Sequence, residues 1–124
     1  MYEKEFSTVI GLTPEKRYEY FIKKVVDYEE IWTLFENGWV LSTDGQGNSL
    51  FPIWPKKEFA QFCAKEEWKK CEVKSIDLDE FMNEWADSFR NEGIHLDVFS
   101  NNESSVSRKI DDLLIDLTKE LENY

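Results

Sequence analysis

The chain has 124 residues, of which 41% are hydrophobic and 33% charged, and its formal net charge at pH 7 is −11. This length and an aromatic content of 15% allow one hydrophobic core without disulfides or metals, which excludes a wholly disordered protein. No apolar run approaches the ~20 residues that cross a bilayer, and the mixed charges of residues 1–6 are unlike a signal peptide. We therefore expect a cytoplasmic protein that forms a single domain over residues 1–124, with no membrane contact.

Residues 1–12 show no clear periodicity and are predicted to be an extended lead-in to a compact core of residues 13–122. Thr13 can cap a helix and Pro14 suits its first position, so a helix is predicted from there to about Val26. Its buried stripe is formed by apolar side chains at helical spacing, namely Tyr18, Phe21, Ile22 and Val25.

Residues 30–35 and 39–43 are rich in branched and aromatic side chains and flank the pair Asn37–Gly38. Because both residues of that pair tolerate positive φ, the pattern predicts a β-hairpin with a type I′ turn. A looser turn over residues 44–48 leads to a third strand at 49–54. Pro52 cannot donate to a ladder, so this third strand is predicted at a sheet edge or with a bulge.

The C-terminal half alternates helices and strands. Pro55 is predicted to open a helix over residues 56–66, in which Phe59, Phe62 and Cys63 share a face, and residues 71–76 read as a strand. The capping box of Asp77 and Glu80 predicts a helix that ends at Gly93. Its apolar stripe consists of Leu78, Phe81, Met82, Trp85 and Phe89.

Residues 94–99 alternate as a fifth strand, and a loop follows at 100–105. Ser107 is predicted to cap a last helix. The apolar seam of that helix consists of Ile110, Leu113, Leu114, Leu117 and Leu121. The predicted order is α-β-β-β-α-β-α-β-α, which indicates an α+β (mixed α/β) fold with helices packed on a mixed five-stranded sheet.

The negative charge is concentrated in the C-terminal portion. Residues 1–76 carry 13 acidic and 11 basic side chains, whereas residues 77–124 carry 13 acidic and 4 basic ones. Because such a field repels a polyanion, we expect no nucleic-acid partner. It attracts a basic protein partner, although an acidic surface also serves solubility alone.

No catalytic, cofactor or metal site is predicted. His95 is the sole histidine and shares a strand face with Asp97, but no nucleophile motif accompanies it. Cys63 and Cys71 form neither a CxxC pair nor part of a zinc cluster, so we expect two unpaired thiols. The loop 45–47 links strand to strand and lacks a phosphate-binding pattern.

The carboxylates Asp112, Asp116 and Glu120 are spaced to line up on the outer face of the last helix. They extend over ~12 Å, which is too far for one ion, so they are predicted to be solvated or to contact a basic partner. The carboxylates of the preceding helix, Asp79, Glu80, Glu84 and Asp87, are predicted to form a solvated face. Trp39 and Trp54 are the tryptophans predicted to be partly exposed and available as protein-contact residues.

A series of aromatic, glycine and proline positions runs through most of the chain: Tyr18, Phe21, Val25, Ile31, Trp32, Leu34, Gly38, Trp39, Asp44, Gly45, the run 51–55, Glu58, Phe59, Ala60, Glu80, Phe81, Trp85, Val98 and Phe99. In these residues the chain resembles the bacterial domain-of-unknown-function family 2750 (DUF2750) over about residues 15–118, most specifically in the Pro-x-Trp-Pro step at 52–55. It is similar, more distantly, to the SseB N-terminal domain, although Phe99–Ser100–Asn101 stands where that domain has Asn-Pro. The resemblance implies a small cytoplasmic bacterial domain without a known catalytic motif, in keeping with antitoxins of the immunity class.

Three functions remain open. The first is a non-catalytic protein-binding module, immunity-like or regulatory, whose affinity for a basic partner falls as salt rises. The second is a small enzyme that uses His95 with a carboxylate, which requires a concave pocket at that residue. The third is a homo-oligomeric scaffold that pairs through an edge strand.

Overall fold

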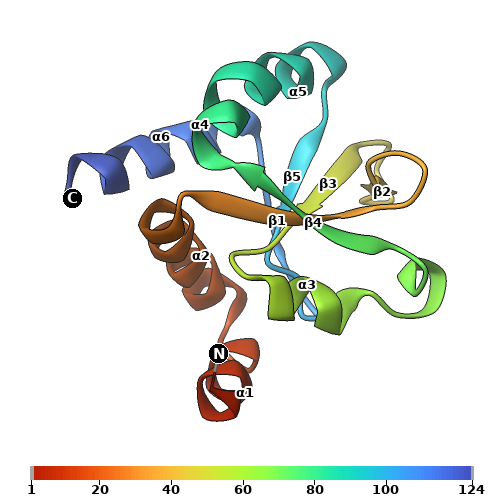
Figure 1. Cartoon of the computed structure of the whole chain (residues 1–124). Coiled ribbons are helices and arrows are strands. Elements are labelled where there is room, and N and C mark those ends of the chain that lie inside the picture. The colour runs from red at the N-terminus through yellow and green to blue at the C-terminus, as the bar shows by residue number, and fades with distance from the viewer. Residues whose placement is uncertain (1, 124) are drawn as a thin grey trace.

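The computed structural model describes residues 2–123 (Figure 1). An N-terminal pair of helices precedes three strands, and further helices and strands follow, most of them joined by short connections. The elements are α1 (Glu3–Ile10), α2 (Pro14–Tyr28), β1 (Glu30–Phe35), β2 (Ser42–Thr43), β3 (Ser49–Ile53), α3 (Lys57–Cys63), the 3₁₀ turn η1 (Glu66–Trp68), β4 (Glu72–Asp77), α4 (Leu78–Glu80), the π-helical segment η2 (Phe81–Trp85), α5 (Ala86–Glu92), β5 (His95–Val98), β6 (Val106–Arg108) and α6 (Ile110–Glu122).

The strands form two ladders, so the predicted single five-stranded sheet is wrong while the α+β class is confirmed. β1 pairs antiparallel with β4 along its whole length, from Glu30 opposite Asp77 to Phe35 opposite Glu72. The other ladder has the order β2-β3-β5-β6, in which β3 and β5 are parallel and the outer pairs antiparallel. The backbones of Trp32 and Trp54 exchange two hydrogen bonds of 2.9 and 2.8 Å, which join the two ladders.

A turn with positive φ is present at Asn37–Gly38, but the predicted type I′ geometry is wrong, because three residues lie between the paired Phe35 and Trp39. The hairpin does not continue beyond this turn. Asn37 has φ 57° and Gly38 has φ 146°, and Phe35 faces Trp39 in an isolated bridge. The predicted strand 39–43 is reduced to Ser42–Thr43, which pairs with β3 instead of β1. The hairpin ends early because the Trp39 ring packs on the rings of neighbouring elements, and β4 takes the place of the hairpin partner.

The predicted extended lead-in at 1–12 is wrong, because residues 3–10 form α1. The helix is held by apolar side chains on one face: Val9 is buried, and the Phe6 ring stacks on Phe59 of α3 at 5.1 Å. The Glu5 carboxylate adds a hydrogen bond from Tyr20 of α2. Tertiary packing therefore orders a helix that is too short to persist alone in water.

The predicted helix starts at Thr13 and Asp77 are confirmed, since each side chain accepts a backbone N–H in the first turn. Two other helix starts are wrong. Lys56, not Pro55, precedes α3, which ends at Cys63 instead of residue 66. Ser107 lies within β6, and α6 begins at Ile110 after an extended Lys109 without a side-chain cap.

Pro52 lies inside the four-stranded ladder, where β3 has β2 on one side and β5 on the other, so the predicted edge position is wrong for the strand. β2 ends opposite Ser49 and Leu50, however, and does not reach Pro52. The Pro52 carbonyl instead accepts a hydrogen bond of 2.6 Å from the buried Thr33 hydroxyl of β1. The missing N–H is therefore tolerated because no neighbouring strand requires it there.

The core lies between the ladders and the helices around them. In Figure 1, α2 and α6 lie on one side of the strands, α4 and α5 above them and α3 below. Large, fully buried side chains of this core lie in or directly after α2, β3, α3, η2 and β5. They include Phe21, Phe51, Trp54, Phe59, Phe81 and Phe99. No helix among residues 2–123 combines the length and the apolar character that a membrane span requires.

Candidate functional site

A groove with a volume of about 670 Å³ opens between the segment before β2 and the helix α4-η2-α5. Its walls combine aromatic rings with carboxylates, and we call it the aromatic groove. It is lined by Trp39, Leu41, Phe51, Glu80, Glu84, Trp85, Ser88, Phe89, Glu92 and Ile94.

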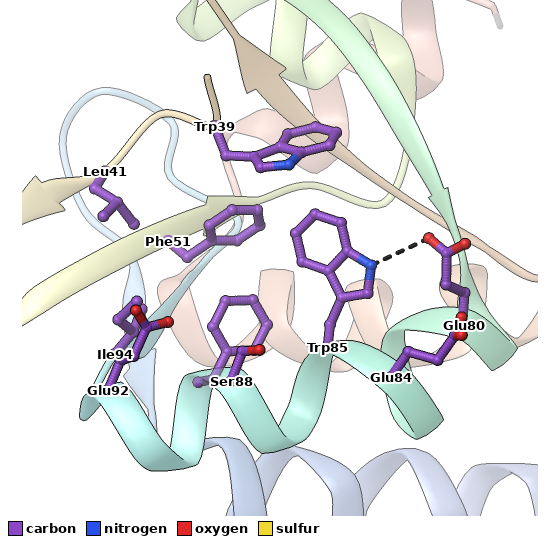
Figure 2. A pocket seen from close by; sticks show the side chains of 10 residues that line it. Trp39, Leu41, Phe51, Glu80, Glu84, Trp85, Ser88, Glu92 and Ile94 are labelled. Atoms are coloured by element: carbon purple, nitrogen blue, oxygen red, sulfur yellow. Dashed lines mark hydrogen bonds between the residues drawn. The ribbon is translucent and has the colours of Figure 1, made fainter.

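The floor of the aromatic groove is a cluster of rings in edge-to-face and tilted contact. The centroids of Trp39 and Trp85 are 5.0 Å apart, and Phe51 of β3 lies 5.7 Å from Trp85 and 5.1 Å from Phe89. Figure 2 shows Trp39 and Trp85 turned toward each other next to Phe51. Because these rings also pack on one another, the floor is formed before any ligand arrives.

The turn at Asn37–Gly38 positions Trp39. After this turn, Val40 N–H donates to the Leu34 carbonyl at 3.2 Å, which returns the chain toward β1. The Trp39 ring then lies 5.0 Å from Phe35 on one side, and its side of the groove remains open, with 39% of Trp39 exposed. A large aromatic side chain that is held in place and still accessible is a typical anchor for a binding partner.

The π-helical segment η2 positions Trp85. Such segments insert an extra residue into a helical turn and are frequent at functional sites. Here η2 separates α4 from α5, and the Trp85 indole N–H donates to the Glu80 carboxylate at 3.1 Å across it (Figure 2). In a complete capping box, the Glu80 carboxylate would accept the backbone N–H of Asp77. It accepts the Trp85 indole N–H instead, which fixes the indole at the groove wall.

Three exposed carboxylates, those of Glu80, Glu84 and Glu92, stand along the rim of the aromatic groove. Glu84, Ser88 and Glu92 follow one another at four-residue intervals, so they lie along one side of the helix. Within the described residues, the groove lining includes no Lys, Arg or His, and no ion pair includes Glu84 or Glu92. The groove is therefore negative along a rim that borders an apolar floor.

Of the two tryptophans predicted to be partly exposed, one is exposed and the other is buried. Trp39 is exposed, as predicted, and lines the aromatic groove. The exposure predicted for Trp54 is wrong: this side chain is fully buried, and its indole N–H donates to the Ser100 carbonyl at 2.9 Å. Trp54 is therefore a core residue that connects β3 to the loop after β5.

The predicted solvated row on α6 is wrong in part. Asp112 is exposed, but Asp116 and Glu120 are half-buried. The Asp116 carboxylate lies 2.5 Å from Arg108 and also accepts from the Tyr18 hydroxyl of α2. Burial opposes ionisation of Asp116, but the hydrogen bonds from Tyr18 and Arg108 prevail and lower its pKa. These α6 carboxylates are not part of the aromatic groove.

His95 is half-buried on β5 and lines a separate pocket of about 370 Å³ that includes Asp111 and Asp112. The carboxylate of Asp97 is buried and accepts a hydrogen bond from Ser105. Burial raises the pKa of Asp97, and that hydrogen bond partly counteracts the effect. Across residues 2–123, no group of three or more His, Cys, Asp or Glu side chains could hold a metal ion.

Sequence reasoning missed most of the aromatic groove. It assigned Trp85, Phe89 and Phe51 to the core or to a strand without a surface role, and it treated Glu84 as part of a solvated face. A usable signal is the spacing of Glu84, Ser88 and Glu92 next to the Trp85–Phe89 pair, which places an acidic row beside an aromatic row on one helix.

Comparison with known proteins gives a family but no function. A family model described as "Protein of unknown function (DUF2750)" matches residues 18–117, which include the whole aromatic groove and leave α1 outside the match. A search of curated proteins returned no similar sequence.

Proposed function

The chain belongs to the DUF2750 family, whose function is unknown, and we propose that it is a non-catalytic protein-binding module that uses the aromatic groove to bind a basic protein partner. An immunity protein and a regulator both act in this way. The proposal includes a cytoplasmic location, with which the two free thiols, Cys63 and Cys71, are compatible.

One observation carries this proposal: an open, preformed aromatic floor with three rim carboxylates and no basic lining residue among those described. Protein interfaces concentrate their binding energy in a few Trp, Tyr and Arg side chains near the centre of the contact. Trp39 and Trp85 offer two such anchors in contact with each other. Burying an apolar partner side chain against them contributes about 1.5–3 kcal/mol.

The rim carboxylates have a different role. Exposed ion pairs contribute only about 0.2–1 kcal/mol each, so affinity comes mainly from the rings. The carboxylates raise the association rate of a basic partner and disfavour an acidic one. The acidic excess of residues 77–124 extends this effect beyond the groove. Raising the salt concentration should therefore slow association more than it speeds dissociation.

A selection from displayed random linear peptides tests the proposal. Peptides are selected on the wild-type protein alone, and each enriched peptide is then measured against a Glu84→Lys/Glu92→Lys variant, in which the rim charge is reversed. The control variant Glu19→Lys/Glu67→Lys has the same charge change at exposed sites outside the groove. We expect enriched peptides with net positive charge and apolar residues that bind the wild type and the control variant but not the groove variant.

Two results would refute the proposal. One is the enrichment of peptides without positive charge. The other is the enrichment of basic peptides that bind the groove variant as well as the wild type, which would place their site elsewhere. Both variants are first checked by circular dichroism and urea unfolding, so that loss of folding is separated from loss of binding.

A further inference from the structure

The dimensions of the aromatic groove restrict what can occupy it. Glu84 and Glu92 are eight residues apart along the helix, which corresponds to a rise of about 12 Å. Between them stands Ser88, whose short side chain leaves the middle of this rim low. The rim therefore has a carboxylate near each end and a gap in the centre, above Phe51 and Phe89 of the floor.

The aromatic groove is open to solvent beside Trp39, so an occupant inserts only the side chains that face the aromatic floor. A single extended segment inserts only the side chains of one face, which fits the groove.

The spacing of the carboxylates specifies which side chains face them. In an extended segment every second residue points to the same side, and residues i and i+4 are about 13–14 Å apart. This matches the ~12 Å between the Glu84 and Glu92 positions, and residue i+2 then lies over the gap at Ser88. The carboxylates near the two ends of the groove favour a cation at each end, and the aromatic floor favours an apolar side chain in the centre.

We propose that the occupant of the aromatic groove is an extended segment of a partner protein with the pattern basic-x-apolar-x-basic. Its two basic side chains meet Glu84 and Glu92, and its central apolar side chain enters beside Ser88 onto the aromatic floor. This inference rests on the proposed function and adds the conformation and register of the partner. Glu80 has a positioning role, because its carboxylate holds the Trp85 indole.

The test uses synthetic fluorescein-labelled peptides with blocked ends. The first, Gly-Ser-Arg-Thr-Leu-Thr-Arg-Ser-Gly, has the proposed pattern. The second, Gly-Ser-Arg-Thr-Leu-Arg-Thr-Ser-Gly, has the same composition but turns its second arginine to the opposite face. The third replaces the central leucine with serine. Fluorescence polarisation gives each Kd, and the indole N–H signals of Trp39 and Trp85 report binding at the groove by NMR.

We expect the serine peptide to bind at least tenfold more weakly than the first peptide, because an apolar side chain is no longer buried. We expect the shifted peptide to bind about three- to fivefold more weakly, through the loss of one exposed ion pair. The Glu84→Lys/Glu92→Lys variant should lose most of the affinity for the first peptide, and the Glu19→Lys/Glu67→Lys variant should retain it.

A shifted peptide that binds within twofold of the first would overturn the extended register. Tighter binding by a helical peptide with basic residues seven or eight positions apart would also overturn it. So would tighter binding by free spermine, a polyamine of similar charge spacing. In these three cases the indole signals still move, and the proposed function is judged separately by the peptide selection. Unchanged indole signals with all peptides would overturn the groove as the site.

Discussion

Replacing Arg17 tests whether a buried cation that forms no ion pair within residues 2–123 stabilises this fold. Arg17 is 1% exposed, and its guanidinium group donates to backbone carbonyls of three segments. The acceptors are Phe99 after β5 at 3.1 Å, Ser104 in the following loop at 2.8 Å, and Leu12 before α2. Burial lowers the pKa of Arg17 from its usual range, which shows that desolvation opposes the charge.

The magnitude for Arg17→Met follows from these opposing effects. Methionine keeps the apolar stem but leaves the three carbonyls without their donor. Losing the buried charge-assisted bond to Phe99 costs about 1.5–3 kcal/mol. The three part-buried bonds, to the Leu12 carbonyl and to the carbonyl and hydroxyl of Ser104, cost about 0.5–1.5 kcal/mol each. Removing the desolvation cost of the cation offsets part of this. We expect a net destabilisation of about 3 kcal/mol.

Urea unfolding followed by circular dichroism measures the effect, with the m value as a check on two-state behaviour. The matched control is Arg90→Met, which removes surface ion pairs to Asp87 and Asp111 from a side chain that is 43% exposed. That change should cost much less than Arg17→Met, because solvent screens exposed ion pairs. If Arg17→Met cost less than the control, or stabilised the protein, desolvation would outweigh the hydrogen bonds and the reasoning would be refuted.

Three further predictions concern other parts of the molecule. Phe6→Ala should release α1 by removing the ring stacked on Phe59 and lower stability by about 2 kcal/mol; hydrogen exchange should quicken in α1 first, and unchanged exchange there would contradict this. Because burial raises the pKa of Asp97, the protonated form is favoured in the folded state, so stability relative to Asp97→Asn should be greatest in acid and decline as pH rises through the folded-state pKa; parallel urea midpoints from about pH 3 to 7 would argue against it. Burial raises the pKa of Cys63 to about 11, so iodoacetamide at pH 8 should label the half-exposed Cys71 first, as judged by mass spectrometry of digests, and equal rates would disprove the shielding.

Local features of the fold could be predicted from the sequence because short-range chemistry determines them. The caps at Thr13 and Asp77 need only a side-chain oxygen and the next helical turn. The turn at Asn37–Gly38 and the left-handed Gly93, with φ 66°, depend on residues that tolerate positive φ. The two caps, the positive φ values of the turn and the left-handed Gly93 were confirmed, whereas the type I′ geometry predicted for the turn was wrong.

Strand partners could not be predicted in the same way. The composition of residues 30–35 indicates a strand but says nothing of whether 39–43 or Glu72–Asp77 pairs with it. Tertiary packing determines the partner: Trp39 packs against Trp85, and β1 pairs with β4 instead of with residues 39–43. The helix α1 was missed although Phe6, Val9 and Ile10 have helical spacing, because so short a pattern becomes a helix only when another surface covers it.

The candidate site was predicted only where exposure follows from local position. Trp39, next to a turn, is exposed as expected. Trp54, next to a proline, is buried because its backbone joins the two ladders and its indole bonds to Ser100. The π-helical segment that presents Trp85 has no sequence signature in the helical stripe, so the groove becomes visible only in the folded chain.

The pairing of strands distant in sequence also bears on how the chain folds during synthesis. β1 must wait for β4, and Arg17 cannot reach Ser104 until 87 further residues have been made. At ribosomal rates of about 5–20 residues per second, that interval is roughly 4–17 s. In the earlier part of this interval, until β4 has been made, the apolar β1 has no partner strand and is exposed to association with other chains. A nascent chain of this topology should therefore be a chaperone client over most of its length, and folding should be completed only when the last strands and α6 have left the ribosome.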